Sequence, residues 1–141
     1  GINCKSFFFM MQQVVKQSMI PAQKGSIVNI ASIAGVRGMP VPLCSPTYSA
    51  SKGGVISLTQ QAAVEWGSYN IRVNAVAPGG ITEDGNPESE APEIFKGQRP
   101  LPHGCTQSDV ASMVLYLAGE ECSCLTGSTT VLDGGAHIVG N

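Results

Sequence analysis

The chain has 141 residues, of which 43% are hydrophobic and 13% are charged, and its formal net charge is −2. This length suits one domain with its own core, and the low charge with high apolar content excludes a disordered chain. No basic cluster is present to bind nucleic acid, and no apolar run approaches the roughly 18 residues that a membrane-spanning helix needs. The start of the sequence lacks the layout of a signal peptide. We therefore expect a soluble cytoplasmic domain that binds neither nucleic acid nor membranes.

Five cysteines are an odd number in a chain too long to need a disulfide framework, so reduced thiols are expected. An alternative is a metal site built from one histidine and three cysteines, namely His103, Cys105, Cys122 and Cys124. Each candidate pair is separated by a single residue, whereas paired zinc ligands are usually separated by about two to four. The sequence therefore predicts no metal.

The first predicted elements are a helix and a strand. Residues 3–20 carry apolar side chains at three- and four-residue steps, which predicts a helix that Pro21 and Gly25 end. Residues 27–31 are short, apolar and β-branched, which is typical of a strand buried on both faces. A passage rich in glycine and proline follows, over residues 35–46.

A second helix and strand occupy the middle of the chain. Ser45 is the predicted N-cap and Pro46 the first helical residue, because a proline at that position loses no hydrogen bond. Apolar residues at helical spacing continue this helix to about Trp66. Residues 71–76 form the second predicted strand, which the sequence Pro78-Gly79-Gly80 ends.

The last part of the chain begins with an acidic stretch, residues 83–93, which we expect to be a mobile surface loop. A capping-box pattern at residues 106–109 begins a helix to Leu117, and residues 129–132 form a third strand. Alternating helices and strands predict an α/β fold with right-handed crossovers and a partial doubly wound (Rossmann-like) parallel sheet with flanking helices. Because three strands leave an outer edge unpaired, the pattern looks like part of a larger sheet.

Tyr48 and Lys52 are four residues apart on the second helix, so their side chains share one face. An ammonium group beside a phenol favours the phenolate, which a general acid/base acting on an alcohol or ketone requires. Gly53 and Gly54 follow, at a cost of about 1 kcal/mol each inside a helix. A packed helix, a bound cofactor or both must therefore approach closely.

Ser32 and the Pro78-Gly79 sequence come at the carboxyl ends of the first and second predicted strands. In an open parallel sheet, ligands bind outside these ends. A serine hydroxyl there can donate to a carbonyl oxygen and hold a substrate beside Tyr48. The alternative for Ser32 is a residue that forms the turn after the strand.

Four ordered motifs resemble the short-chain dehydrogenase/reductase family, and together they cover essentially the whole chain. They are Ile27-Val28-Asn29-Ile30-Ala31-Ser32, Tyr48-Ser49-Ala50-Ser51-Lys52, Ile71-Arg72-Val73-Asn74-Ala75-Val76-Ala77-Pro78-Gly79, and Leu125-Thr126-Gly127 followed by Val131-Leu132-Asp133-Gly134-Gly135. The resemblance implies that residues 1–141 form the C-terminal, catalytic half of a single Rossmann-like domain.

The resemblance also implies roles for individual residues. Tyr48 corresponds to the catalytic acid/base, Lys52 to the lysine that supports it and binds the nicotinamide ribose, and Ser32 to the serine that orients the substrate oxygen. Asn3 matches the helix asparagine that supports a proton relay through water; its alternative is a polar residue near a helix start. These residues imply a small carbonyl or alcohol substrate.

The nicotinamide-binding loop of the family resembles residues 78–82. The resemblance assigns cofactor binding to Pro78, Gly79, Ile81 and Thr82 of this loop, together with Tyr48 and Lys52. The family threonine more often comes one position later, where this chain has Glu83. The sequence contains no Gly-rich dinucleotide fingerprint after a strand, so NAD and NADP are not distinguished.

Two functions remain from the sequence. One is an NAD(P)-dependent oxidoreductase that transfers a hydride between cofactor and a carbonyl/alcohol substrate, of which residues 1–141 by themselves are expected to be inactive. The other is an inactive fragment or oligomerisation module that binds no dinucleotide by itself and associates through apolar helix faces, with Phe7, Phe8 and Met11 on one helix and Val55, Leu58 and Ala62 on the next. The family resemblance favours a homotetramer or homodimer.

Overall fold

A computed structural model describes residues 2–41, 43, 45–82 and 99–139. The predicted acidic loop, 83–93, lies outside these residues. None of the helices within the described ranges is long and apolar enough to cross a membrane. The elements follow in this order: α1 (Ile2–Val14), η1 (Val15–Met19), α2 (Ile20–Ala22), β1 (Gly25–Ile30), η2 (Ile33–Gly35), α3 (Pro46–Trp66), η3 (Gly67–Tyr69), β2 (Ile71–Pro78), β3 (Ile81–Thr82), β4 (Cys105–Thr106), α4 (Gln107–Ala118), η5 (Glu120–Cys122), β5 (Thr129–Leu132) and η6 (Ala136–Ile138).

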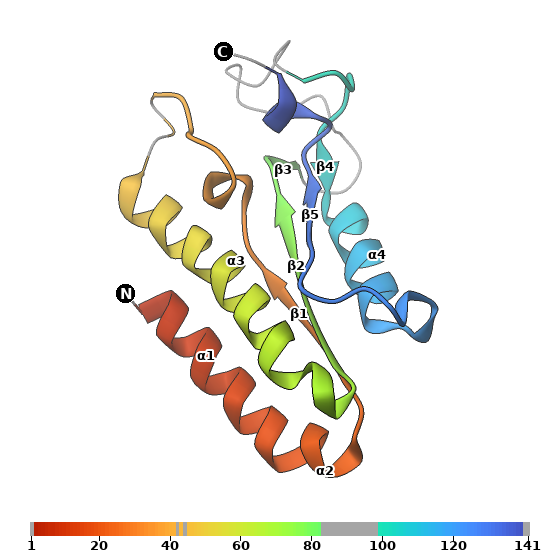
Figure 1. Ribbon diagram of the computed structural model, residues 1–141. Helices are drawn as coiled ribbons and strands as arrows, with labels where there is room; N and C mark the ends of the chain where they lie inside the picture. Colours follow the sequence, from red (N-terminus) through yellow and green to blue (C-terminus); the bar gives the residue numbers. More distant parts are fainter. Residues whose placement is uncertain (1, 42, 44, 83–98, 140–141) are drawn as a thin grey trace.

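Three parallel strands form the sheet in the order β1-β2-β5, which confirms the predicted α/β class with its partial parallel sheet. Figure 1 shows α1 and α3 side by side on one face of this sheet and α4 on the other. β1 pairs with β2 from Gly25 opposite Ile71 onward, and β2 pairs with β5 up to Pro78 opposite Leu132. The carboxyl ends of the three strands therefore meet at one edge. β3 and β4 form a second, short parallel pair that the apolar pattern did not predict.

The core lies on both sides of β2, because this central strand is buried along almost its whole length. On the α1/α3 side, Val15 and Trp66 pack with Val73. On the α4 side, Leu117 packs with Val76, and its side chain is fully buried. The two polar residues of the strand are paired, since Arg72 donates to the Leu117 and Gly119 carbonyls and Asn74 donates to the Leu125 carbonyl.

The prediction that Pro21 ends the first helix is wrong, because helical backbone continues through α2 to Ala22. The preceding η1 is a π-helical turn, in which the Ile20 amide donates to the Val15 carbonyl five residues back. This wider turn accommodates a proline that would clash with the carbonyl four residues back in an α-helix. The helix ends instead at Gln23, whose φ of 51° is left-handed.

The two main helix starts agree with the sequence, but only one is capped by a side chain. Ser45 takes the N-cap position of α3 and Pro46 the first helical position, without a capping bond from the serine side chain. At α4, the Thr106 side chain accepts from the Asp109 amide while the Asp109 carboxylate accepts from the Thr106 amide at 2.8 Å. These bonds from Thr106 to the charged carboxylate lower the pKa of Asp109.

The apolar helix faces predicted to bind a partner are partly used inside the chain itself. Met11, Val55 and Ala62 are all buried in the core between the helices and the sheet. The exposed large apolar residues of α1 are instead Phe9, 48% exposed, Met10, 70% exposed, and Val14, 47% exposed. Apolar side chains therefore cover more of the α1 surface than the core of this chain buries.

Candidate active site

Tyr48 and Lys52 lie together on the first turns of α3, at the carboxyl edge of the sheet. The Lys52 Nζ atom is 5.7 Å from the centroid of the Tyr48 ring. Lys52 also donates a hydrogen bond of 2.9 Å to the carbonyl oxygen of Ile30, the last residue of β1. The Tyr48 side chain is 45% exposed, so its hydroxyl can reach a ligand in solution. One turn of helix thus presents a cation and a phenol above the end of β1.

Ser32 begins the tight turn that follows β1. Its backbone is extended and its Oγ atom accepts a hydrogen bond of 3.2 Å from the Ala34 amide, so Ser32 caps the short helix η2. The predicted turn-forming role is therefore present. Because this bond uses a lone pair of the oxygen, the hydroxyl proton can still donate to a ligand. The turn-forming role and the predicted hydrogen bond to a substrate oxygen are therefore compatible in Ser32.

Gly35 places the Ser32 turn directly on the helix that carries Lys52. A Cβ atom added to Gly35 would lie 2.6 Å from the carbonyl carbon of Lys52 and 2.7 Å from the Gly53 nitrogen. Only glycine allows two backbones to approach so closely. This contact fixes the position of the turn that carries Ser32 relative to the part of the α3 backbone from which the Lys52 side chain extends.

The end of β2 forms the neighbouring part of the site. Pro78 is the last residue of β2, and a Cβ atom added to Gly79 would lie 2.7 Å from the Cβ of Asp133 and 3.6 Å from the Ile33 side chain. Gly79 therefore sits between the Ser32 turn and the segment after β5. The structure brings the ends of all three strands together around this glycine.

Ile81 and Thr82 form β3, beyond the strand-end glycines. Ile81 is 47% exposed, whereas Thr82 is 1% exposed. The Thr82 hydroxyl is one of two buried side-chain oxygens without a hydrogen-bond partner in the described part of the chain. A buried hydroxyl without a partner is costly, so a ligand that supplied one would be favoured here. The backbone of Asn3 lies in α1, but its side chain is outside the described part of the structure, as that of Glu83 is.

The two helix glycines have different neighbours. A Cβ atom on Gly54 would lie 2.5 Å from the Cys4 sulfur of α1, while one on Gly53 would meet only the Gly35 oxygen at 3.7 Å. Close packing of α1 on α3 therefore explains Gly54, which supports packing over a cofactor as the reason for that glycine.

This difference predicts opposite effects of two adjacent substitutions. Gly53→Ala is expected to raise the free energy of unfolding by up to about 1 kcal/mol, because alanine favours helix and finds room. Gly54→Ala is expected to lower it, since its methyl group overlaps Cys4. Urea denaturation of both variants and the wild type measures the difference. Equal urea midpoints for the two variants would contradict the close contact between Gly54 and the Cys4 sulfur.

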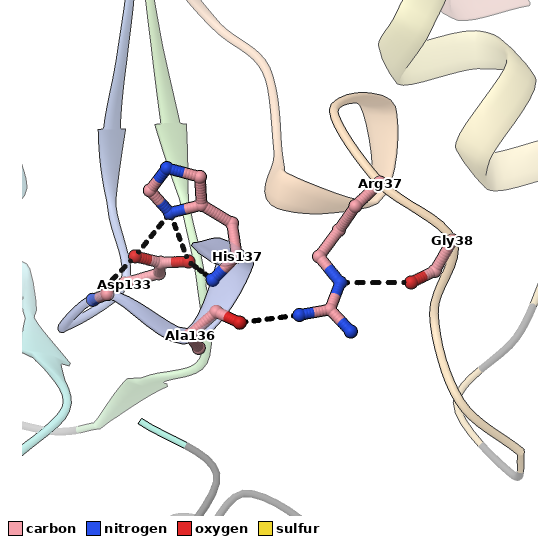
Figure 2. A network of polar contacts seen from close by, with 6 residues as sticks. Arg37, Gly38, Asp133, Ala136 and His137 are labelled. Carbon is pink, nitrogen blue, oxygen red and sulfur yellow. Dashed lines mark hydrogen bonds and ion pairs between the residues drawn. The ribbon is translucent and has the colours of Figure 1, made fainter. Parts of the chain in front are cut away.

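The turn after β5 carries a polar network beside the site, which the sequence did not indicate. The Asp133 carboxylate accepts from the His137 amide at 2.7 Å, from the Gly135 amide at 2.9 Å and from His137 Nδ1 at 3.0 Å. Figure 2 shows the Arg37 guanidinium directed at the Ala136 carbonyl oxygen, to which it donates. An aspartate before two glycines indicates a turn. No local sequence pattern predicts that the Ala136 carbonyl of this turn contacts Arg37.

A cavity of about 400 Å³ lies on the α4 side of the sheet. Its lining includes Cys105, Met113 and Tyr116. Burial, followed by the charges of Asp109 and Asp133, raises the pKa of the Cys105 thiol to about 11, so it stays protonated near neutral pH and is a poor nucleophile. Among the described residues, no group of three His, Cys, Asp or Glu side chains is arranged to hold a metal ion.

The residues at the carboxyl edge fit the nicotinamide end of a dinucleotide. Lys52 offers an ammonium group, Tyr48 an exposed hydroxyl, and Thr82 a buried hydroxyl that lacks a partner. A diphosphate is usually held by a Gly-rich turn between a strand and a helix N-terminus. The present sequence has no such turn.

Comparison with known proteins agrees with this geometry. Residues 1–137 match the family model described as "Enoyl-(Acyl carrier protein) reductase". The chain is 41% identical over 98% of its length to a 3-oxoacyl-[acyl-carrier-protein] reductase of Thermotoga maritima, covering 55% of that protein. It is 40% identical over 98% of its length to a 7alpha-hydroxysteroid dehydrogenase of Bacteroides fragilis, covering 52%.

The fold also matches solved structures. A crystal structure of a 3-oxoacyl-[acyl-carrier protein] reductase from Brucella melitensis with bound NAD superposes with a TM-score of 0.76 and 33% identity. The match covers 92% of this chain and 47% of that one. The chain thus spans about half the length of the relatives it matches. Its sequence motifs, its parallel sheet and these matches agree, and the chain belongs to the short-chain dehydrogenase/reductase family.

Proposed function

We propose that this chain carries the catalytic residues of an oxidoreductase that interconverts a carbonyl and an alcohol with NAD or NADP. The observation that carries the proposal is the Lys52 ammonium 5.7 Å from the centre of the Tyr48 ring, on the helix against which the Ser32 turn packs. The two relatives named above concern an oxoacyl group and a hydroxysteroid at almost equal identity. The proposed substrate class is therefore a carbonyl or alcohol, without a narrower assignment.

The positions of the side chains support the following assignment of the proton transfer. When bound, the nicotinamide supplies or accepts the hydride. Tyr48 donates its hydroxyl proton to the carbonyl oxygen during reduction and takes it back from the alcohol during oxidation. Lys52 uses one of its three N–H groups on the Ile30 carbonyl, which leaves the others for the ribose and for the phenolate.

Three further assignments complete the proposal. Ser32 donates its hydroxyl proton to the substrate oxygen, in the direction left open by its bond with Ala34. Pro78, Gly79, Ile81 and Thr82 bind the nicotinamide, and the buried Thr82 hydroxyl supports this role. Asn3 supports the proton relay, an assignment that rests on the family resemblance. In this proposal, residues 1–141 act as the C-terminal, catalytic half of one Rossmann-like domain.

The test is turnover, with NADH and NADPH in separate assays, by the purified full-length protein that contains residues 1–141. The carbonyl substrates are a 3-oxoacyl thioester, a ketosteroid and a small ketone, and loss of nicotinamide absorbance measures the reaction. The expected result is cofactor consumption with at least one pair, lost in Lys52→Met. A folded protein that consumes neither cofactor with any of these substrates would overturn the proposal.

A second candidate is a part-domain that binds no dinucleotide by itself. One observation favours it, because β1 pairs with β2 alone among the described strands and so leaves one edge of a three-stranded sheet open. Titration with NADH and NADPH, followed by energy transfer from Trp66, distinguishes the two candidates. The second candidate predicts no saturable signal with either cofactor, and saturable binding would exclude it.

A further inference from the structure

One short segment after β5 contacts both loops that the proposed reaction needs. Leu132 accepts a hydrogen bond of 2.8 Å from the Gly79 amide, and the Asp133 side chain packs against Gly79 with no space for a Cβ between them. On its other side, the same segment presents the Ala136 carbonyl to Arg37 (Figure 2). Residues 132–137 therefore lie between the glycine loop and the Ser32 turn.

Asp133 makes this segment rigid. Its side chain is 2% exposed, and its carboxylate collects the amides of Gly135 and His137 together with the His137 ring nitrogen. A buried carboxylate that accepts several N–H bonds holds its donors in one arrangement, because losing any of them leaves charge unpaired. The direction of the Ala136 carbonyl is thereby fixed.

Arg37 connects this fixed carbonyl to the turn that Ser32 begins. The Arg37 amide donates to the Ile33 carbonyl at 3.0 Å, and the Gly35 amide donates to the Ser32 carbonyl at 2.9 Å. Movement of the arginine therefore moves the turn. The guanidinium also donates to the Gly38 carbonyl at 3.2 Å, which orients it within its own loop.

We propose that Arg37 is a positioning residue: through the Ala136 carbonyl, it fixes the Ser32 hydroxyl relative to the Gly79 loop. This inference rests on the proposed function, in which Ser32 binds the substrate oxygen and Gly79 the nicotinamide. In this proposal Arg37 contacts neither the substrate oxygen nor the nicotinamide, and it acts through the turn that carries Ser32. Because a displacement of about 1 Å can cost up to about 100-fold in rate, the bridge affects catalysis more than stability.

The test combines kinetics with amide hydrogen exchange in the purified protein. Arg37→Ala is expected to lower kcat by about 10- to 100-fold with little change in the KM for NAD(P)H, because the displaced Ser32 acts on the substrate oxygen. Exchange of the Gly35 and Arg37 amides is expected to accelerate. Arg37→Lys, which keeps a cationic donor, is expected to restore part of both. Lys16→Ala, an exposed cation on η1, is the control with unchanged values.

The outcomes separate this inference from the proposed function. Unchanged exchange in Arg37→Ala overturns the bridge, whatever the activity. Faster exchange with an unchanged kcat overturns the positioning role while the proposed function stands. A wild-type protein without turnover overturns the proposed function and the positioning role together, and the exchange result still decides whether Arg37 holds the turn.

Discussion

Tyr48→Phe is expected to lower kcat by about 10²- to 10⁴-fold, which is the usual contribution of a positioned general acid or base. The substitution removes one hydroxyl from a side chain that is 45% exposed, so the fold and the packing of α3 should not change. Cofactor affinity should fall much less than kcat, because Lys52 and the β2 loop remain in place. Steady-state kinetics in both directions, with cofactor binding measured separately, gives the comparison.

The matched control is Tyr69→Phe, since Tyr69 is a similarly exposed tyrosine at the opposite end of α3. Its loss should leave both kcat and the free energy of unfolding unchanged. Turnover by Tyr48→Phe at the level of the control would contradict the assignment of the proton transfer to Tyr48.

Gly35→Ala is expected to destabilise the fold and to reduce activity at once. The new methyl group would lie 2.6 Å from the Lys52 carbonyl carbon, and backbone atoms cannot rotate away as a side chain can. The Ser32 turn must then move off α3, at a cost of about 1–3 kcal/mol, as for other overpacked cores. The same movement separates Ser32 from the Tyr48/Lys52 pair. Urea denaturation and kcat, measured on one preparation, report the two effects.

Gly38→Ala is the control for this experiment. Gly38 belongs to the same loop, but nothing lies within 4 Å of the position that its Cβ would take. Its free energy of unfolding should stay within about 0.5 kcal/mol of the wild type. If Gly35→Ala unfolds at the urea concentration of this control, the close contact between the turn and α3 does not exist in solution.

Local patterns predicted the parts of the structure that depend on neighbours in the sequence. α4 begins where its capping box predicts, because Thr106 and Asp109 satisfy each other across three residues. Tyr48 and Lys52 come together because a helix places residues four apart on one face. The first helix shows the limit of such reasoning, since a π-turn carries the chain through Pro21.

The sequence by itself thus determined the order of the main helices and of the three sheet strands, the parallel sheet and the Tyr48/Lys52 pair. The tertiary structure alone decided what surrounds them. Arg37 meets the Ala136 carbonyl across 99 residues, and Gly35 rests on the Lys52 backbone in another element. Such contacts have no characteristic spacing, because they depend on how the strand ends converge. Hydrophobic periodicity and helix capping act between residues that are close in the sequence. A site at the edge of a sheet is assembled by packing between residues that are distant in the sequence.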